Sequence, residues 1–173
     1  MLLILRIIHV LSAAVLVGFT LFSYFVLRPV LQLIPPAHAV VVAQRVGTLF
    51  TYTGWTALGL LFLSGVLRLY YAGDLVVIFS LDLYAHGHGR SLAIMILSWF
   101  VTVATSSIMT FVLRPRVMKK LAVNSNPSLA DVEKRRTAQI AASTWLERLQ
   151  LVIVIFSTLA LIAGVSIMYG GLF

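Results

Sequence analysis

The stretch LLILRIIHVLSAAVLVGFTLFSYFVL, residues 2–27, decides the fold, because only Arg6 and His9 interrupt it with a basic side chain. About 20 apolar residues suffice for one α-helix to cross the hydrocarbon core of a bilayer. Three further runs of this kind follow, at about residues 49–71, 91–113 and 146–169. We therefore predict an all-α integral membrane protein, a four-helix transmembrane bundle that residues 1–173 form as a single domain.

The composition excludes the soluble classes of protein. Hydrophobic residues make up 61% of the chain and charged residues 10%, whereas a soluble domain keeps about a quarter of its residues charged. Cysteine is absent, which excludes a disulfide framework and an iron–sulfur cluster. The net charge of +8 comes from basic residues that flank the apolar runs, so it predicts orientation in a bilayer and no nucleic-acid partner.

The basic residues lie mainly in two of the connections between the runs. The first connection carries Arg28 and Arg45, and the basic loop at residues 114–142 carries Arg114, Arg116, Lys119, Lys120, Lys134, Arg135 and Arg136. Both connections lie on the same side of a protein with four spans. The positive-inside rule then predicts a multi-pass protein of the inner (plasma) membrane, with these loops in the cytoplasm and both termini outside it.

Each apolar run carries a stripe of small, hydroxyl or polar residues at helical spacing, and such stripes are typical of helix interfaces within membranes. We expect the four stripes to meet in one bundle interior, where most of the hydroxyls serve packing. We also expect Glu147 to pair with Arg45, Arg114 or Arg148. The stripes are Ser12, Ala13, Thr20 and Ser23; Thr53, Thr56, Leu60, Ser64 and Arg68; Ser91, Met95, Ser98, Thr102, Thr105 and Met109; and Ser143, Glu147, Gln150, Val154, Ser157, Leu161, Gly164 and Met168.

Arg6 and His9 are the first candidates for a functional site, because ionisable side chains inside a span are costly and usually functional. They are three residues apart and so share a helix face. His9 lies about 10–12 Å along the helix from its outer end. Arg6 can reach the headgroups, but His9 cannot. Two roles for His9 stay open, a hydrogen bond to a hydroxyl of a neighbouring helix or the binding of a ligand.

The second candidate is His86-Gly87-His88-Gly89-Arg90, at the outer mouth of the third run. Two histidines between glycines can bend onto one metal ion, and imidazole suits copper or zinc. An ordinary polar loop is the alternative. The predicted orientation brings this motif to the same outer half as Arg6, His9, Arg68, Met95 and Met168.

This outer cluster has two chemical interpretations. Imidazole with thioether suits a copper ion held by His9, His86, His88, Met95 and Met168. Imidazole with arginines suits a tetrapyrrole, because histidine ligates haem iron and arginine pairs with propionates. Arginine would repel a bare cation, so we favour haem b bound by His9, Arg6, Arg68 and Arg90. His86, His88, Met95 or Met168 is a candidate for the other axial position, which is otherwise open. A third interpretation is a non-catalytic subunit that serves only the assembly of a membrane complex.

Three short pieces of the chain are similar to a known family. They are Arg6 with His9, Arg45 leading to Gly54, and the segment RVMKKLA at residues 116–122. In these pieces the chain resembles the HemJ-type protoporphyrinogen oxidases and the related copper resistance D (CopD) membrane proteins. The resemblance implies that His9 holds a b-type haem, and it places a lysine where this chain has Arg90. It also implies oxidation of protoporphyrinogen, with electrons leaving to quinone or another membrane carrier. A homo-oligomer is compatible with this pattern.

Overall fold

A computed structural model describes residues 1–73, 75, 77–80, 84–115 and 129–171, with the backbone alone for residues 36, 37, 40, 77 and 129–143. The first span consists of three consecutive helical segments, which are α1 (Leu2–Leu21), the π-helical turn η1 (Phe22–Leu27) and α2 (Arg28–Leu33). The remaining elements are α3 (Pro36–Ala72), the 3-10 turn η2 (Val77–Phe79), α4 (Gly87–Ser107), the π-helical turn η4 (Ile108–Leu113), α6 (Leu129–Ser166) and the 3-10 turn η5 (Ile167–Tyr169).

The prediction of an all-α protein with a four-helix transmembrane bundle is confirmed. Four helical segments are long and apolar enough to cross a membrane, at Leu2–Leu33, Val41–Ala72, Gly87–Leu113 and Thr144–Tyr169. The first span continues past the expected end at Leu27, because Pro29 lies in the first turn of α2, where proline is tolerated. The second span likewise starts well before the expected residue 49.

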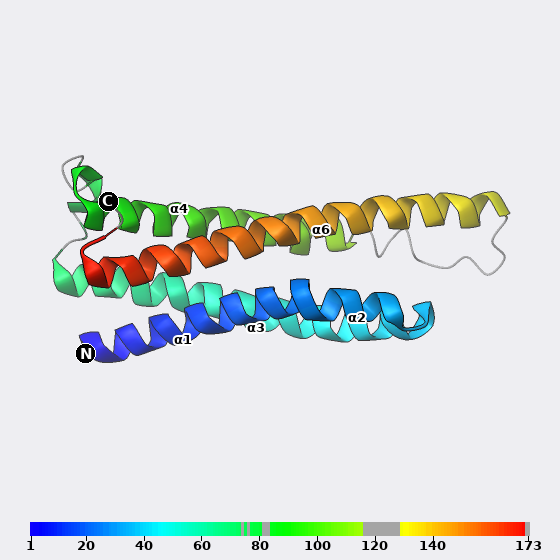
Figure 1. Ribbon diagram of the computed structural model, residues 1–173, viewed down its shortest axis with the longest axis horizontal. Coiled ribbons are helices and arrows are strands. Elements are labelled where there is room, and N and C mark those ends of the chain that lie inside the picture. The colour runs from blue at the N-terminus through cyan, green and yellow to red at the C-terminus, as the bar shows by residue number, and fades with distance from the viewer. Residues whose placement is uncertain (74, 76, 81–83, 116–128, 172–173) are drawn as a thin grey trace.

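The predicted basic loop at 114–142 is partly helical. Residues 116–128, which include the family-like segment at 116–122, lie outside the described residues. From Leu129 the backbone is helical, and α6 continues into the fourth span without a break. The long helix therefore extends beyond the apolar part of the bundle (Figure 1).

The bundle consists of two pairs of helices. Figure 1 shows α1 beside α3 and α4 beside α6, with both chain termini at one end, which we call the terminal end. A hydrogen bond of 3.3 Å between Thr20 Oγ1 and Ser157 Oγ joins α1 to α6. Large side chains join α3 to α4, since Trp99 donates to the carbonyl of Leu58 at 3.4 Å and stacks on Phe62 with ring centroids 5.2 Å apart. The two pairs thus enclose one interior.

Hydroxyl groups line this interior, as the stripes of α1, α4 and α6 predict. Most of them bond to a carbonyl of their own helix, as Thr102 does to Ser98 at 2.8 Å, so they can be buried without an unpaired donor. The stripe on α3 was partly wrong, because Thr56 and Leu60 are exposed while Ala57 and Leu58 are buried. The buried polar residues are Ser12, Thr20, Ser23, Ser64, Ser91, Ser98, Thr102, Thr105 and Ser157.

The second pair of helices repeats the first. The pentapeptide Phe-Val-Leu-Arg-Pro occurs at residues 25–29 and again at 111–115, and its first three residues close a π-helical turn each time. The partner helices also correspond, because Ser-Gly-Val at residues 64–66 of α3 matches Ala-Gly-Val at residues 163–165 of α6. Both pairs run outward from the terminal end and back, so they have the same orientation (Figure 1).

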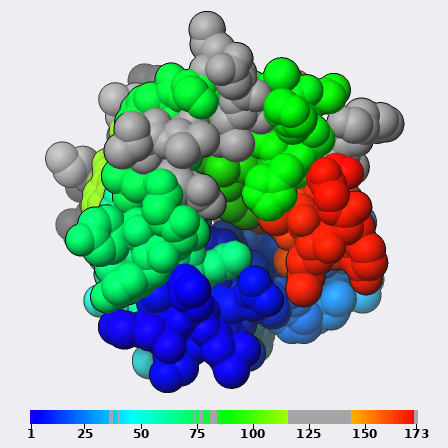
Figure 2. All heavy atoms as spheres, turned by 90° about the vertical axis from the view of Figure 1, so that its left-hand side faces the viewer, coloured from blue at the N-terminus to red at the C-terminus, as the bar shows by residue number. Residues whose placement is uncertain are grey.

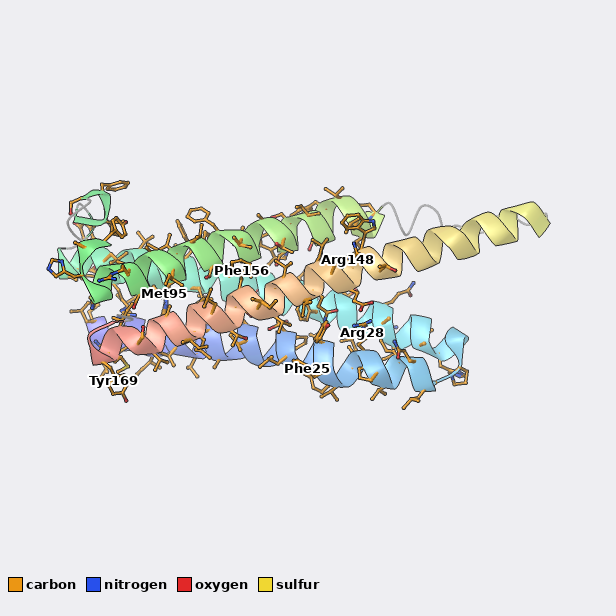
Figure 3. The ribbon with its side chains drawn as sticks, turned by 45° about the horizontal axis from the view of Figure 1, so that its top comes forward. Phe25, Arg28, Met95, Arg148, Phe156 and Tyr169 are labelled. Atoms are coloured by element: carbon orange, nitrogen blue, oxygen red, sulfur yellow. The ribbon has the colours of Figure 1, made fainter. Side chains whose placement is uncertain are left out.

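The arginines of the repeated pentapeptide each contact the other pair. Arg28 forms an ion pair with Glu147 of α6, with Nη2 and Oε2 2.5 Å apart, and Figure 3 shows Arg28 on the side of its helix that faces α6. Arg114 donates to the hydroxyls of Thr48 and Thr51 of α3, at 2.9 Å each. The expected partners of Glu147 were therefore wrong. The sequence alone did not show that the end of the first span lies against α6.

The start of α4 and the end of α6 are joined at the terminal end. Ser166 Oγ donates to Ser91 Oγ at 2.9 Å. Beyond it, Gly171 has a φ of +99° and fits so closely against α4 that a Cβ there would overlap the backbone of Gly87. Only glycine combines this backbone conformation with this approach. These contacts fix the start of α4 next to the end of the chain.

Candidate functional site

His9 of α1 lies against α3 through a polar contact. Its Nδ1 is 2.8 Å from the hydroxyl oxygen of Ser64, which is buried with 2% of its surface exposed. Ser64 Oγ is in turn 2.5 Å from the carbonyl oxygen of Leu60, one turn earlier in α3. The first of the two roles expected for His9, a hydrogen bond to a hydroxyl of a neighbouring helix, is thus present.

The contact of Ser64 with a carbonyl favours one tautomer of His9. In the contact with Leu60 the hydroxyl of Ser64 is the donor, because a carbonyl can only accept. The oxygen of Ser64 then accepts from Nδ1–H of His9. In the neutral imidazole this leaves the lone pair on Nε2, the nitrogen that is free to bind a metal. The hydroxyl contact and a ligand role for His9 are therefore compatible.

Gly65 allows α3 to approach the imidazole closely. A Cβ at this position would lie 3.4 Å from Cε1 and 3.9 Å from Nδ1 of His9. The ring is thus held between a hydrogen-bonding serine and a helix surface that has no side chain. A fixed ring with a defined tautomer is what a metal-ligating histidine requires.

Two positive charges lie near His9. Arg6 lies three residues before His9 on α1, and Arg68 lies one helical turn beyond Ser64, the residue of α3 that contacts His9. Among the described side chains, Glu147 is the only carboxylate, and it is paired with Arg28. The described residues therefore provide no counter-charge for Arg6 and Arg68, which leaves these guanidinium groups available to an anion.

Met95 of α4 lies at the contact between α4 and α6. Its Sδ would be 3.6 Å from a Cβ at Gly164 of α6. Figure 3 shows Met95 toward the terminal end of the bundle, where these two helices run side by side. The side chains of His9 and Met95 are both half-buried.

The other predicted site residues lie at the surface of the terminal end. His86, His88 and Arg90 are exposed, and Arg90 Nη2 donates to the carbonyl of Ala85 at 3.1 Å. Met168 is 71% exposed. Within the described parts of the chain, no three His, Asp or Glu residues come together in a way that could hold a metal ion. The structure thus brings Arg6, His9 and Arg68 together and leaves the histidine pair apart as a surface feature.

The terminal end of the bundle is hollowed between its helices. Figure 2 looks onto this end and shows the start of α1, the end of α3 and the end of α6 around a depression in which deeper atoms are visible.

No protein-family model, no curated protein and no solved structure matches this chain. The chemical interpretation therefore depends on the residues themselves.

Sequence reasoning did not single out Ser64 and Gly65 as the contacts of His9. Ser64 was expected only as one hydroxyl of a packing stripe, and Gly65 was not part of that stripe. The repeat contained a usable signal, because a small residue followed by Gly-Val occurs once in each helix pair, at residues 64–66 and 163–165. Such adjacent small residues allow close helix contacts within a membrane.

The two glycines are expected to respond differently to replacement by alanine. Gly164→Ala should raise the stability by about 0.5–1 kcal/mol, because alanine favours a helix and the flexible thioether of Met95 accepts an ordinary contact. Gly65→Ala should raise the stability by less, because the new Cβ would lie 3.4 Å from the hydrogen-bonded ring of His9. Thermal unfolding of both variants in detergent measures the difference. An equal gain for both would show that the imidazole is not held against Gly65.

Proposed function

We propose that this protein is a membrane-embedded redox protein that binds one b-type haem in the half of the bundle next to the terminal end. His9 would be the axial ligand, through Nε2. Arg6 and Arg68 would pair with the propionates, and Arg90 would do so from the rim. The observation that carries this proposal is the chain of hydrogen bonds from His9 through Ser64 to Leu60, because it leaves Nε2 unprotonated in the neutral ring.

The residues near His9 fit haem better than a bare metal ion. A cation would be repelled by Arg6 and Arg68, whereas an anionic tetrapyrrole would supply the counter-charge that the described residues lack. The apolar bundle suits the porphyrin ring, and the hollow at the terminal end offers a path of entry (Figure 2).

When bound, haem supplies one-electron redox chemistry, and the protein sets its potential through the ligands and through burial. In this role Ser64 would hold the imidazole, the arginines would orient the propionates, and the surrounding helices would keep water out. The resemblance to HemJ-type proteins supports an oxidoreductase that takes electrons from protoporphyrinogen and passes them to quinone or a similar membrane carrier. We place it in the inner membrane with its basic segments in the cytoplasm, which puts the site on the outer side.

The visible absorption spectrum of the protein purified in detergent after expression with added haem precursor tests the proposal. We expect a Soret band that shifts on reduction with dithionite and is lost in His9→Ala. His38→Ala is the matched control, because His38 is exposed and lies at the start of α3, far from the terminal end, and its spectrum should equal that of the wild type.

Other outcomes would contradict the proposal. A colourless protein that retains copper through dialysis, and loses it when His86 and His88 are both replaced, would make it a copper-binding protein of the CopD kind. A folded protein that holds neither haem nor copper would make it an assembly subunit. A Soret band that survives His9→Ala would assign the ligand elsewhere.

A further inference from the structure

The repeat within the chain relates His9 to Met95. The alignment that superposes Phe25–Pro29 on Phe111–Pro115 also superposes His9 on Met95 and Ser12 on Ser98. The π-helical turns η1 and η4 fall at matching positions in this alignment. His9 and Met95 are therefore equivalent residues of α1 and α4, although their chemistry differs.

The contacts of the two residues support this equivalence independently. The glycine whose Cβ position meets His9 is Gly65, and the glycine whose Cβ position meets Met95 is Gly164. Gly65 and Gly164 are themselves equivalent, because each is followed by Val and preceded by a buried small residue, Ser64 or Ala163. His9 and Met95 thus occupy the same layer of the bundle, one in each helix pair.

In this layer, His9 and Met95 are more exposed than the inward residues on either side of them. His9 lies four residues after Leu5 and three before Ser12, so it belongs to the inward stripe of α1. Leu5 and Ser12 are buried, whereas His9 is only half-buried. The same holds on α4, where Ser91 and Ser98 are buried to 0% and 1% exposure and Met95 is half-buried. In both halves the candidate ligand is thus a partly exposed residue between two buried ones, and the small residues of the same layer, Ser64 and Ala163, are buried at 2% and 0% exposure.

We propose that Met95 is the second residue, with His9, that would hold the iron of the haem. This inference rests on the proposed function and deepens it. It selects Met95 from four candidates, because His86, His88 and Met168 lie exposed at the rim while Met95 shares the layer of His9. The haem would then sit between the two halves of the repeat, with one ligand from each.

The pairing has a chemical consequence. A thioether stabilises ferrous haem and raises its reduction potential relative to a second imidazole, because sulfur is the softer donor. Thioether is also neutral at every accessible pH, so the ligand set adds no charge to the membrane interior. The helix pair that carries His9 would hold the imidazole in place, and the pair that carries Met95 would set the reduction potential.

The test compares Met95→Leu and Met95→His in full-length protein purified with haem. Met95→Leu has nearly the same volume, so it should fold and keep the haem on His9. It should lose the spectrum of a six-coordinate low-spin haem, and the reduced form should bind carbon monoxide, which the wild type resists. Met95→His should restore a low-spin spectrum with a lower reduction potential. Met168→Leu is the matched control and should leave the spectrum and the potential unchanged.

The outcomes separate this inference from the proposed function. If the wild type binds haem through His9 but Met95→Leu keeps the wild-type spectrum, potential and resistance to carbon monoxide, the second ligand is not Met95 and only this inference fails. If Met168→Leu shows the change instead, the ligand comes from the rim. If the wild type binds no haem, both proposals fail together.

Discussion

Replacement of Ser64 by alanine is expected to weaken haem binding by roughly 10- to 100-fold, which is the usual effect of removing a group that orients a metal ligand. Without the hydroxyl, Nδ1 of His9 loses the acceptor at 2.8 Å, and the preference for a lone pair on Nε2 is lost with it. Titration of the haem-free protein with haemin, followed at the Soret band, measures the affinity.

The fold should tolerate this change. The equivalent residue of the second helix pair is already alanine, since Ala163 holds in α6 the place that Ser64 holds in α3. Ser98→Ala is the matched control, because Ser98 is also a buried serine but lies one layer deeper, and it should leave the affinity unchanged. Equal affinity of Ser64→Ala and the wild type would mean that the hydrogen bond does not orient the ligand.

Replacement of Ala163 by leucine is expected to have the largest effect on stability. Ala163 is fully buried at 0% exposure where α6 packs against α4, so the added atoms have no space. Overpacking of this kind costs about 1–3 kcal/mol, which corresponds to a lowering of the melting temperature by about 2–12 °C. Thermal unfolding of the detergent-solubilised protein measures the shift.

Ile162→Leu provides the control for this experiment. It changes the preceding residue of the same helix, whose side chain is 52% exposed on the outer surface of the bundle. Its melting temperature should equal that of the wild type. If Ala163→Leu also melts at the wild-type temperature, the contact between α4 and α6 is looser than the structure describes.

Much of the fold was predictable, because the hydropathy that identifies a span depends only on the residues of that span. The four spans and the buried stripes of α1, α4 and α6 follow from apolar length and from the spacing of hydroxyls. The neighbours of each helix do not follow, since they depend on how the spans are arranged. This is why the partner of Glu147 was wrong, and why the inward face of α3 contains Ala57 rather than Thr56.

The candidate site was predictable only in part, for a related reason. A histidine deep in a span, with an arginine one turn away, indicates a functional site, because placing ionisable side chains inside a membrane costs free energy. Which residue of α3 contacts His9 depends on how α3 is rotated about its own axis. A stripe of hydroxyls does not define this rotation to within a fraction of a turn. The repeated pentapeptide at residues 25–29 and 111–115 offered a stronger constraint, because it aligns the two halves and so equates residues of different chemistry.

The two π-helical turns determine which side chains enter the interior beyond them. In the first span the inward stripe reaches Ser23, and the next inward contact is made by Arg28, five residues later. An unbroken α-helix would turn Leu27 inward and rotate Arg28 away by about 100°. The wide turn therefore adds one residue to the register, and its duplicate before Arg114 does the same in the other half. Deleting a single apolar residue from 22–27 should convert the wide turn into an ordinary α-helical turn and bring Arg28 to the place of Leu27, so the ion pair with Glu147 of α6 should be kept.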